Sequence, residues 1–409
     1  MYWLWERKES GYRIIQSMLL LLLSGAVVVC GRNGQQIPEE TVKEQMVIWC
    51  YYETDAQRQA MDDLTAGFNA VSEQYAIRWE YVPMTDFSKR LSMGYTENSL
   101  PDLVLMDNPD MPYYMKTGML ADITDLENQL RIREDYYSVL LGTVYDEGKL
   151  YGLPLNCNNV ALFYRKDILR EAGIEPPTDW ESFAKAVNRL SNGEQYGFLM
   201  SAISGEQGAF QIMPWILSAG EDIHGIGGES TVRSYEYLYD LIISGGMDAN
   251  CINYSQNDVA RKFISGDTVM MENGPWTLPM LEEAGISYGI VPLPADGKQQ
   301  VVVGGENICV LRGKNTEGAK EFIKYCAADD VMKDFCTRTS VLPTKRTLGD
   351  SENEKMQVFR RQMASAVLRT ENKHWNVLRD RLSEGMYEML SAEKTASQVA
   401  DELSEINIK

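Results

Sequence analysis

Short apolar runs alternate with helix-like segments over the first third of the chain. Met46–Cys50, Ala76–Val82 and Pro101–Asp107 are rich in branched and aromatic residues, which is typical of strands. Between them, residues 60–71 carry apolar side chains at the spacing of one helical face, and residues 86–98 predict a second helix. This β-α-β-α-β order predicts an α/β fold with a parallel sheet and helices on both of its faces.

The residues that directly follow these strands are the first candidates for a binding site. Ligands of open parallel sheets bind outside the carboxyl ends of the strands. These positions carry Tyr51, Tyr52, Glu53, Asp107 and Asp110. Asp110 is a rival of Asp107, because the loop can place either carboxylate at the site. For Glu53 and Asp110, a solvated surface charge is an equally good interpretation.

A polar interruption follows a turn at residues 151–154. Asn156, Asn158 and Asn159 stand next to the apolar run Val160–Tyr164. Three amides beside a buried strand cost free energy unless they have partners. They predict a polar ligand or a hinge between two domains, and three asparagines of a surface loop are the alternative.

The remaining two thirds of the chain continue the alternation of strands and helices. A proline turn at residues 174–177 leads into a helix, at whose start Thr178 and Glu181 match a capping box. Further strands are expected at residues 197–201, 269–276 and 286–292, and further helices at 210–220, 235–243, 258–265, 317–336 and 392–408.

The order of three motifs resembles a known family. Tyr151-Gly-Leu-Pro154, Leu162-Phe-Tyr-Arg-Lys-Asp167 and Pro176-Pro-Thr-Asp-Trp-Glu-Ser-Phe183 are similar to segments of the family 1 extracellular solute-binding proteins of ABC sugar importers, which include maltose-binding protein. The resemblance implies a two-lobed periplasmic-binding-protein fold of type II, with a ligand cleft between lobes joined by hinge crossings. The implied lobes are residues 45–155 plus 308–345 and residues 156–307 plus 346–409.

The resemblance also implies residues for a sugar site. A sugar needs flat aromatic rings for its faces and carboxylates or amides for its hydroxyls. The implied stacking rings are Trp276, Phe210, Trp215 and Trp375. Burial in the core is an equal alternative for each of the four.

The candidates for contacts with sugar hydroxyls are Glu53, Asp107, Asn158 and Glu306, and Asn156 is a further candidate of the site. Gly305 permits close backbone approach and hinge movement. Asn158 stands where maltose-binding protein has a glutamate, which indicates a different sugar or hydroxyl pattern.

Charge and composition narrow the function further. The 409 residues carry a formal charge of −20, which argues against nucleic acid and anionic membrane as partners. The cysteines form no Cys-x-x-Cys pair and only two histidines are present, so neither a metal site nor a cofactor is expected. Most cysteines fit small core residues, although disulfides stay open as an alternative.

The amino end predicts export. Residues 14–29 are apolar, follow a basic segment and end at Cys30, as in a lipoprotein signal peptide, with residues 31–44 as a flexible tether. Cys30 is then the lipidated residue. Val29 departs from the small residue that usually precedes this cysteine, and an uncleaved anchor or ordinary secretion are the alternatives.

The resemblance, together with the signal-like amino end, implies a monomeric binding protein on the extracellular face of a bacterial cytoplasmic membrane. It would capture a saccharide and deliver it to ABC permease subunits served by a separate ATPase. A secreted glycoside hydrolase and a binding protein for a non-sugar solute are the alternatives. No pair of carboxylates stands out for hydrolysis, so we expect no enzymatic activity.

Overall fold

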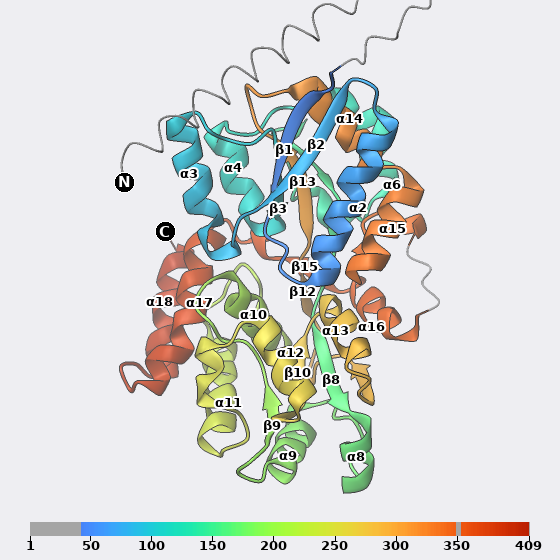
Figure 1. Cartoon of the computed structure of the whole chain (residues 1–409). Coiled ribbons are helices and arrows are strands. Elements are labelled where there is room, and N and C mark those ends of the chain that lie inside the picture. Colours follow the sequence, from blue (N-terminus) through green and yellow to red (C-terminus); the bar gives the residue numbers. More distant parts are fainter. Residues whose placement is uncertain (1–41, 349–352, 409) are drawn as a thin grey trace, which may run out of the picture. The chain divides into compact units, whose positions relative to one another are not determined.

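The computed structural model describes residues 42–348 and 353–408, and these form two lobes, each with its own sheet and hydrophobic core (Figure 1). The predictions for the signal peptide, for Cys30 and for the tether up to residue 41 lie outside the described residues. No helix within the described ranges is long and apolar enough to cross a bilayer.

The N-terminal lobe is built on a five-stranded sheet with the strand order β2-β1-β3-β13-β6. β1 pairs in parallel with β2 and β3, whereas β13 runs antiparallel to β3 and β6. The strands are β1 (Glu44–Cys50), β2 (Tyr75–Tyr81), β3 (Leu103–Asp107), β6 (Gly152–Pro154) and β13 (Glu306–Val310). Its helices are α2 (Asp55–Val71), α3 (Phe87–Glu97), α4 (Met111–Thr117), α5 (Glu127–Leu130), α6 (Ile132–Asp135), α14 (Thr316–Cys326) and α15 (Asp329–Thr339).

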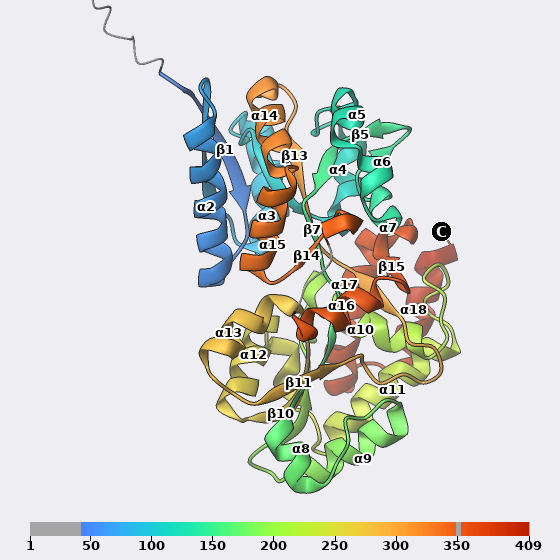
Figure 2. The same ribbon diagram turned by 90° about the vertical axis from the view of Figure 1, so that its right-hand side faces the viewer.

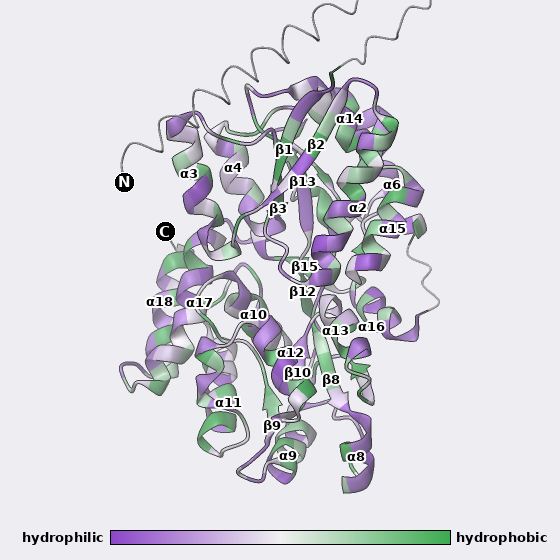
Figure 3. Ribbon diagram, in the orientation of Figure 1, coloured by the Kyte–Doolittle hydropathy of each residue, from purple (hydrophilic) through white to green (hydrophobic). Residues whose placement is uncertain are grey.

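The C-terminal lobe has a four-stranded mixed sheet with the order β11-β8-β10-β9. Its strands are β8 (Ala161–Arg165), β9 (Tyr196–Leu199), β10 (Thr268–Asn273) and β11 (Tyr288–Val291). The apolar colouring of β8 and β9 in Figure 3 reflects their burial. Its helices are α8 (Lys166–Ala172), α9 (Trp180–Leu190), α10 (Glu206–Ser218), α11 (Glu229–Ile243), α12 (Gln256–Ser265), α13 (Leu278–Glu283), α16 (Glu354–Gln362), α17 (Trp375–Leu390) and α18 (Ala396–Ile408).

One pair of short strands and one bridge lie where the chain passes between the lobes (Figure 2). β7 (Asn156–Cys157) pairs with β14 (Leu342–Pro343), and Asn158 bridges to Gly304. Gly305 has a φ of +127°, and a Cβ there would lie 2.2 Å from the carbonyl oxygen of Asn156. Glycine is therefore required at this crossing.

Smaller elements complete the described chain. β12 (Val301–Val303) pairs with β15 (Ala366–Leu368), and β4 (Tyr145–Asp146) with β5 (Lys149–Leu150). One further short helix is α7 (Ser138–Leu141), and the 3-10 turns include η2 (Asn108–Asp110) and η7 (Arg369–Glu371).

Local details differ from the predictions at several element boundaries. The helix predicted after the proline turn is capped by Asp179 with Ser182, not by Thr178 with Glu181, because the Asp179 carboxylate accepts the Ser182 N–H at 2.8 Å. The segment 301–311, which was expected to cross back into the first lobe, carries two strands, β12 and β13, with two glycines between them. The closing helix begins at residue 396, not at 392.

The six cysteines within the described residues are all buried and free, as expected for small core residues.

Candidate ligand-binding cleft

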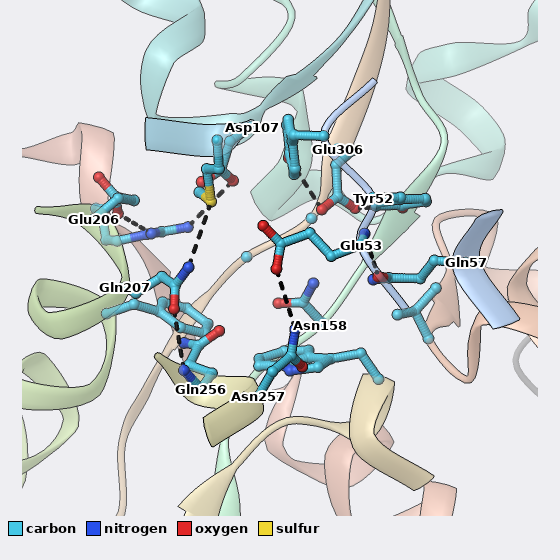
Figure 4. Close-up of a pocket in the computed structure, with 18 residues that line it drawn as sticks. Tyr52, Glu53, Gln57, Asp107, Asn158, Glu206, Gln207, Gln256, Asn257 and Glu306 are labelled. Carbon is cyan, nitrogen blue, oxygen red and sulfur yellow. Dashed lines mark hydrogen bonds and ion pairs between the residues drawn. The ribbon is translucent and has the colours of Figure 1, made fainter. Parts of the chain in front are cut away.

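A cavity of about 810 Å³, counting its solvent-open part, lies between residues of the two lobes (Figure 4). Predicted residues supply about half of its lining. The full lining is Tyr51, Tyr52, Glu53, Gln57, Met84, Asp107, Asn158, Glu206, Gln207, Phe210, Gln256, Asn257, Trp276, Gly304, Gly305, Glu306, Val341 and Arg369.

Strand register explains why residues distant in sequence meet at one edge of the cleft. β1 and β3 are parallel neighbours, so Tyr51 and Asp107 leave the sheet at the same edge. β13 runs the opposite way, and its first residue, Glu306, is the register partner of Asp107. The carboxyl ends of two strands and the amino end of a third therefore form the wall that the N-terminal lobe contributes.

Glu306 accepts hydrogen bonds from two tyrosines. The hydroxyl groups of Tyr51 and Tyr52 each donate to one of its carboxylate oxygens at 3.1 Å. Asn156 in turn donates to the Tyr52 hydroxyl at 3.0 Å. Burial raises the pKa of Glu306, and hydrogen bonds to its carboxylate oppose that shift. Hydrogen bonds from the two tyrosines therefore fix the orientation of the Glu306 carboxylate.

Arg369 connects carboxylates of both lobes. Its guanidinium pairs with Glu206 of α10 and lies 3.7 Å from Asp107 of β3. The same group stacks over the Phe210 ring at 4.5 Å from its centroid. Burial raises the pKa of Asp107 well above its usual range, while the charge of Arg369 acts in the opposite direction. These contacts fix Arg369 across the cleft rather than leaving it mobile.

Aromatic rings line the side of the cleft that belongs to the C-terminal lobe. The centroids of Phe210 and Trp276 are 6.3 Å apart with an interplanar angle of 36°. Trp276 is half-buried and packs against the hydrophobic cores of both lobes. A Cβ on Gly274 would lie 1.9 Å from the Trp276 ring, so that glycine lets the indole fold back over the chain.

Side-chain amides cover much of the remaining lining. Asn158 is 7% exposed, and no hydrogen bond of its side chain is made within the described residues. Gln207 accepts the backbone N–H of Gln256 at 3.1 Å. Asn257 donates to Glu53 across the lobes at 3.4 Å. Amides of this kind can donate to and accept from the same hydroxyl group.

Nine of the predicted residues line the cavity, and four do not. The nine are Tyr51, Tyr52, Glu53, Asp107, Asn158, Phe210, Trp276, Gly305 and Glu306. The other four lie behind the cavity. Trp215 is in the core and donates a hydrogen bond to Glu272 at 2.7 Å, and Trp375 donates one to Glu206 at 3.1 Å. Asp110 forms an ion pair with Arg379 at 2.6 Å, and Asn156 donates a hydrogen bond to the Tyr52 hydroxyl.

Sequence reasoning missed several lining residues. Arg369, Glu206 and Gln207 lie at the ends of β15 and α10, and no local motif marks them. Gln256 and Asn257 open α12, whose capping box Ser255-Gln-Asn-Asp258 was a usable signal for a helix start near the cleft. No group of His, Cys, Asp or Glu side chains suited to a metal ion occurs within residues 42–348 and 353–408.

Comparison with known proteins accords with this geometry. Residues 63–358 match the family described as bacterial extracellular solute-binding protein. A galactooligosaccharide-binding protein of Bacillus subtilis is 24% identical over 353 residues, covering 81% of this chain and 80% of that protein. The sn-glycerol-3-phosphate-binding periplasmic protein of Shigella dysenteriae is 23% identical over 326 residues, covering 72% and 73%.

A solved structure shares the fold. The GacH receptor of Streptomyces glaucescens, determined unliganded and in complex with acarbose, has a TM-score of 0.80 at 23% identity, covering 89% of this chain and 97% of that one. This similarity confirms the predicted two-lobed type II fold. Since the family match spans well over half of the sequence, the chain belongs to the bacterial extracellular solute-binding proteins.

Proposed function

We propose that this protein captures a saccharide in the cleft between its lobes and delivers it to an ABC permease. The observation that carries the proposal is the composition of the cleft. Trp276 and Phe210 offer flat apolar surfaces, and carboxylates and amides from both lobes surround them. Apolar faces beside convergent polar groups suit a ring whose faces are C–H and whose rim is hydroxyl.

Closure of the lobes is the proposed means of capture. Residues of both lobes line the same cavity, so a solute bound there contacts both at once. Polar contacts already join the lobes: Arg379 of α17 pairs with Asp110 of η2, and Asn257 of α12 donates to Glu53. A ligand that adds contacts to both lobes favours the closed form over the open one.

The transport system around the protein and its membrane anchor are part of the same proposal. The permease recognises the closed protein, and a separate ATPase supplies the energy. Cys30, outside the described residues, carries the lipid that holds a monomeric protein at the extracellular face of the membrane. The protein performs no chemical step on its cargo, because the family it belongs to is one of solute-binding proteins.

Thermal denaturation of the full-length protein against a saccharide panel, followed by calorimetry on each hit, tests the proposal. A ligand at a hundred times its dissociation constant adds about 2.7 kcal/mol to the free energy of unfolding. The ligand is then recovered and analysed by chromatography. Binding with intact ligand supports a capture protein. Cleaved sugar would point to a hydrolase, and a panel without any response would remove the saccharide from the proposal.

A further inference from the structure

The charges that line the cleft are unbalanced. Four carboxylates, those of Glu53, Asp107, Glu206 and Glu306, face the cavity with one guanidinium, that of Arg369. With all five groups ionised, the lining has a formal charge of −3. Burial raises the pKa of Asp107 and of Glu306, which favours the neutral forms of these two groups. Even with both neutral, two carboxylates remain against one cation.

Arg369 has little capacity left for an anionic ligand. One of its terminal nitrogens pairs with Glu206, and the other lies 3.7 Å from Asp107 and 3.4 Å from the Val303 carbonyl oxygen. Its Nε is buried and finds no partner among the described residues, and the face of the guanidinium is covered by Phe210. A phosphate or carboxylate would have to displace partners that are themselves negative.

The N-terminal ends of the helices at the cleft already interact with capping and acidic side chains of the chain itself. The first turns of α2, α10 and α12 contribute lining residues, and helix N-termini are ordinary sites for anions. Here Thr54 caps α2 and Ser255 caps α12 through their side chains. Each of the three helices carries an acidic residue in its first turn: Asp55, Glu206 and Asp258. The positive ends of these dipoles are thus already offset by the chain's own carboxylates.

We infer that the cleft selects its solute by charge, taking neutral and amine-bearing saccharides and rejecting sugar phosphates and uronic acids. The inference rests on the proposed function and narrows its cargo. Glu53 is the natural partner of an ammonium group, since its carboxylate reaches into the middle of the cavity (Figure 4). Among the residues that the structure describes, this carboxylate accepts hydrogen bonds only from the neutral donors Tyr81 and Asn257. Asn158, nearly buried and without a side-chain partner in the described chain, offers an amide to a neutral hydroxyl.

Calorimetry of the full-length protein with matched sugars tests the inference. The probes are neutral, amino and phosphorylated forms of glucose and of lactose, and N,N′-diacetylchitobiose with deacetylated chitobiose. We expect every bound neutral or amino sugar to bind about 100-fold more tightly than its phosphate, and we expect this ratio to fall at high salt. A phosphorylated sugar that binds within about threefold of its neutral form would overturn the inference while the saccharide proposal stands. No binding by any probe would remove the saccharide proposal, and the inference with it.

Two variants test whether Glu53 causes the preference for neutral over phosphorylated sugars. Glu53→Gln removes a charge from the cavity and keeps the shape of the side chain. We expect it to reduce the ratio between neutral and phosphorylated sugar by about tenfold. Glu181→Gln, an exposed carboxylate on α9 outside the cavity, should leave the ratio unchanged. A ratio that Glu53→Gln does not alter would overturn the role of Glu53 as the residue that meets the charge of the solute.

Discussion

Burial decides what each aromatic or acidic side chain does in this protein. Both Trp215 and Trp276 were candidate stacking rings by sequence, but α10 points Trp215 into the core of the C-terminal lobe, where it is 1% exposed, while the turn after β10 leaves Trp276 half-buried at the cleft. The direction of a side chain depends on which face of its helix packs against the sheet. That packing depends on contacts between distant parts of the chain, so the residues next to a tryptophan in the sequence do not reveal it.

The first prediction concerns the stacking ring. Trp276→Ala removes an aromatic surface that faces the cavity, so the affinity for a saccharide found with the panel should fall by about 10- to 100-fold. Calorimetry measures the loss, and circular dichroism checks that the protein is folded. Trp79→Ala is the matched control, since Trp79 belongs to β2 and does not line the cleft. Equal affinities of Trp276→Ala and the parent protein would contradict the assigned site.

The second prediction concerns Glu272, a fully buried carboxyl in β10. Trp215 donates to one of its oxygens, and the other has no hydrogen-bond partner within the described residues. Burial raises its pKa well above the ordinary value of 4.5, so the folded state binds its proton more tightly than the unfolded state. Its contribution to stability is complete below pH 4.5 and declines as the pH rises toward the folded pKa.

Glu272→Gln keeps an acceptor for Trp215 but cannot ionise. Relative to the parent protein, the variant should therefore gain stability between pH 5 and pH 8, by about 1 kcal/mol or more. Urea denaturation at both pH values measures the difference. Asp107 and Glu306 titrate in both proteins, so their contribution cancels. A difference between the two proteins that does not change with pH would contradict the assignment.

At the scale of elements, alternation of strands and helices could be read from the sequence because it is a local pattern. Tyr51, Tyr52 and Asp107 were found in this way, since the ends of parallel strands are recognisable along the chain. Arg369 was not, because its position depends on the pairing of β15 with β12, which lies more than sixty residues earlier. Asp110 was placed only approximately: η2 turns its carboxylate toward Arg379 of α17.

The third prediction concerns the glycine between β12 and β13. In Gly305→Ala the new Cβ would meet the Asn156 carbonyl oxygen and the Cys157 Cα, at a φ that side chains rarely adopt. We expect a loss of about 2–3 kcal/mol in the free energy of unfolding, measured by urea denaturation. Gly225→Ala, where the nearest atom is 3.9 Å away and φ is ordinary, should be nearly neutral. Similar stabilities of the two variants would show that the crossing is less constrained than described.

At the scale of the whole molecule, the binding site exists only where the two lobes meet. Tyr51 and Glu306 belong to one lobe, and Phe210 and Trp276 to the other. The family resemblance predicted this arrangement, because it implied hinge crossings near residues 156 and 305, and the structure places Asn158 opposite Gly304 there. Contacts between the lobes could not be predicted, since no periodicity along the chain encodes them.

The fourth prediction concerns one such contact. Asp110→Asn removes the ion pair with Arg379, both of whose side chains are largely buried, and leaves the cavity lining intact. The closed form should become less favourable, and the apparent ligand affinity should fall by about three- to tenfold. Calorimetry measures the affinity, and small-angle scattering measures the compaction on ligand addition. Asp334→Asn breaks an exposed pair with Arg338 inside one lobe and is expected to change neither quantity.

The pairing of β13 between β3 and β6 also determines when the sheet of the N-terminal lobe can be completed during synthesis. β6 meets the rest of the first sheet only through β13, a strand that lies some 150 residues further along the chain. During synthesis or export, the early segments cannot complete their sheet until residue 310 has emerged. Pairing over such long separations slows folding. The first sheet therefore stays unfinished until three quarters of the chain has been released, and the pocket stays incomplete for longer still, because its lining includes Arg369.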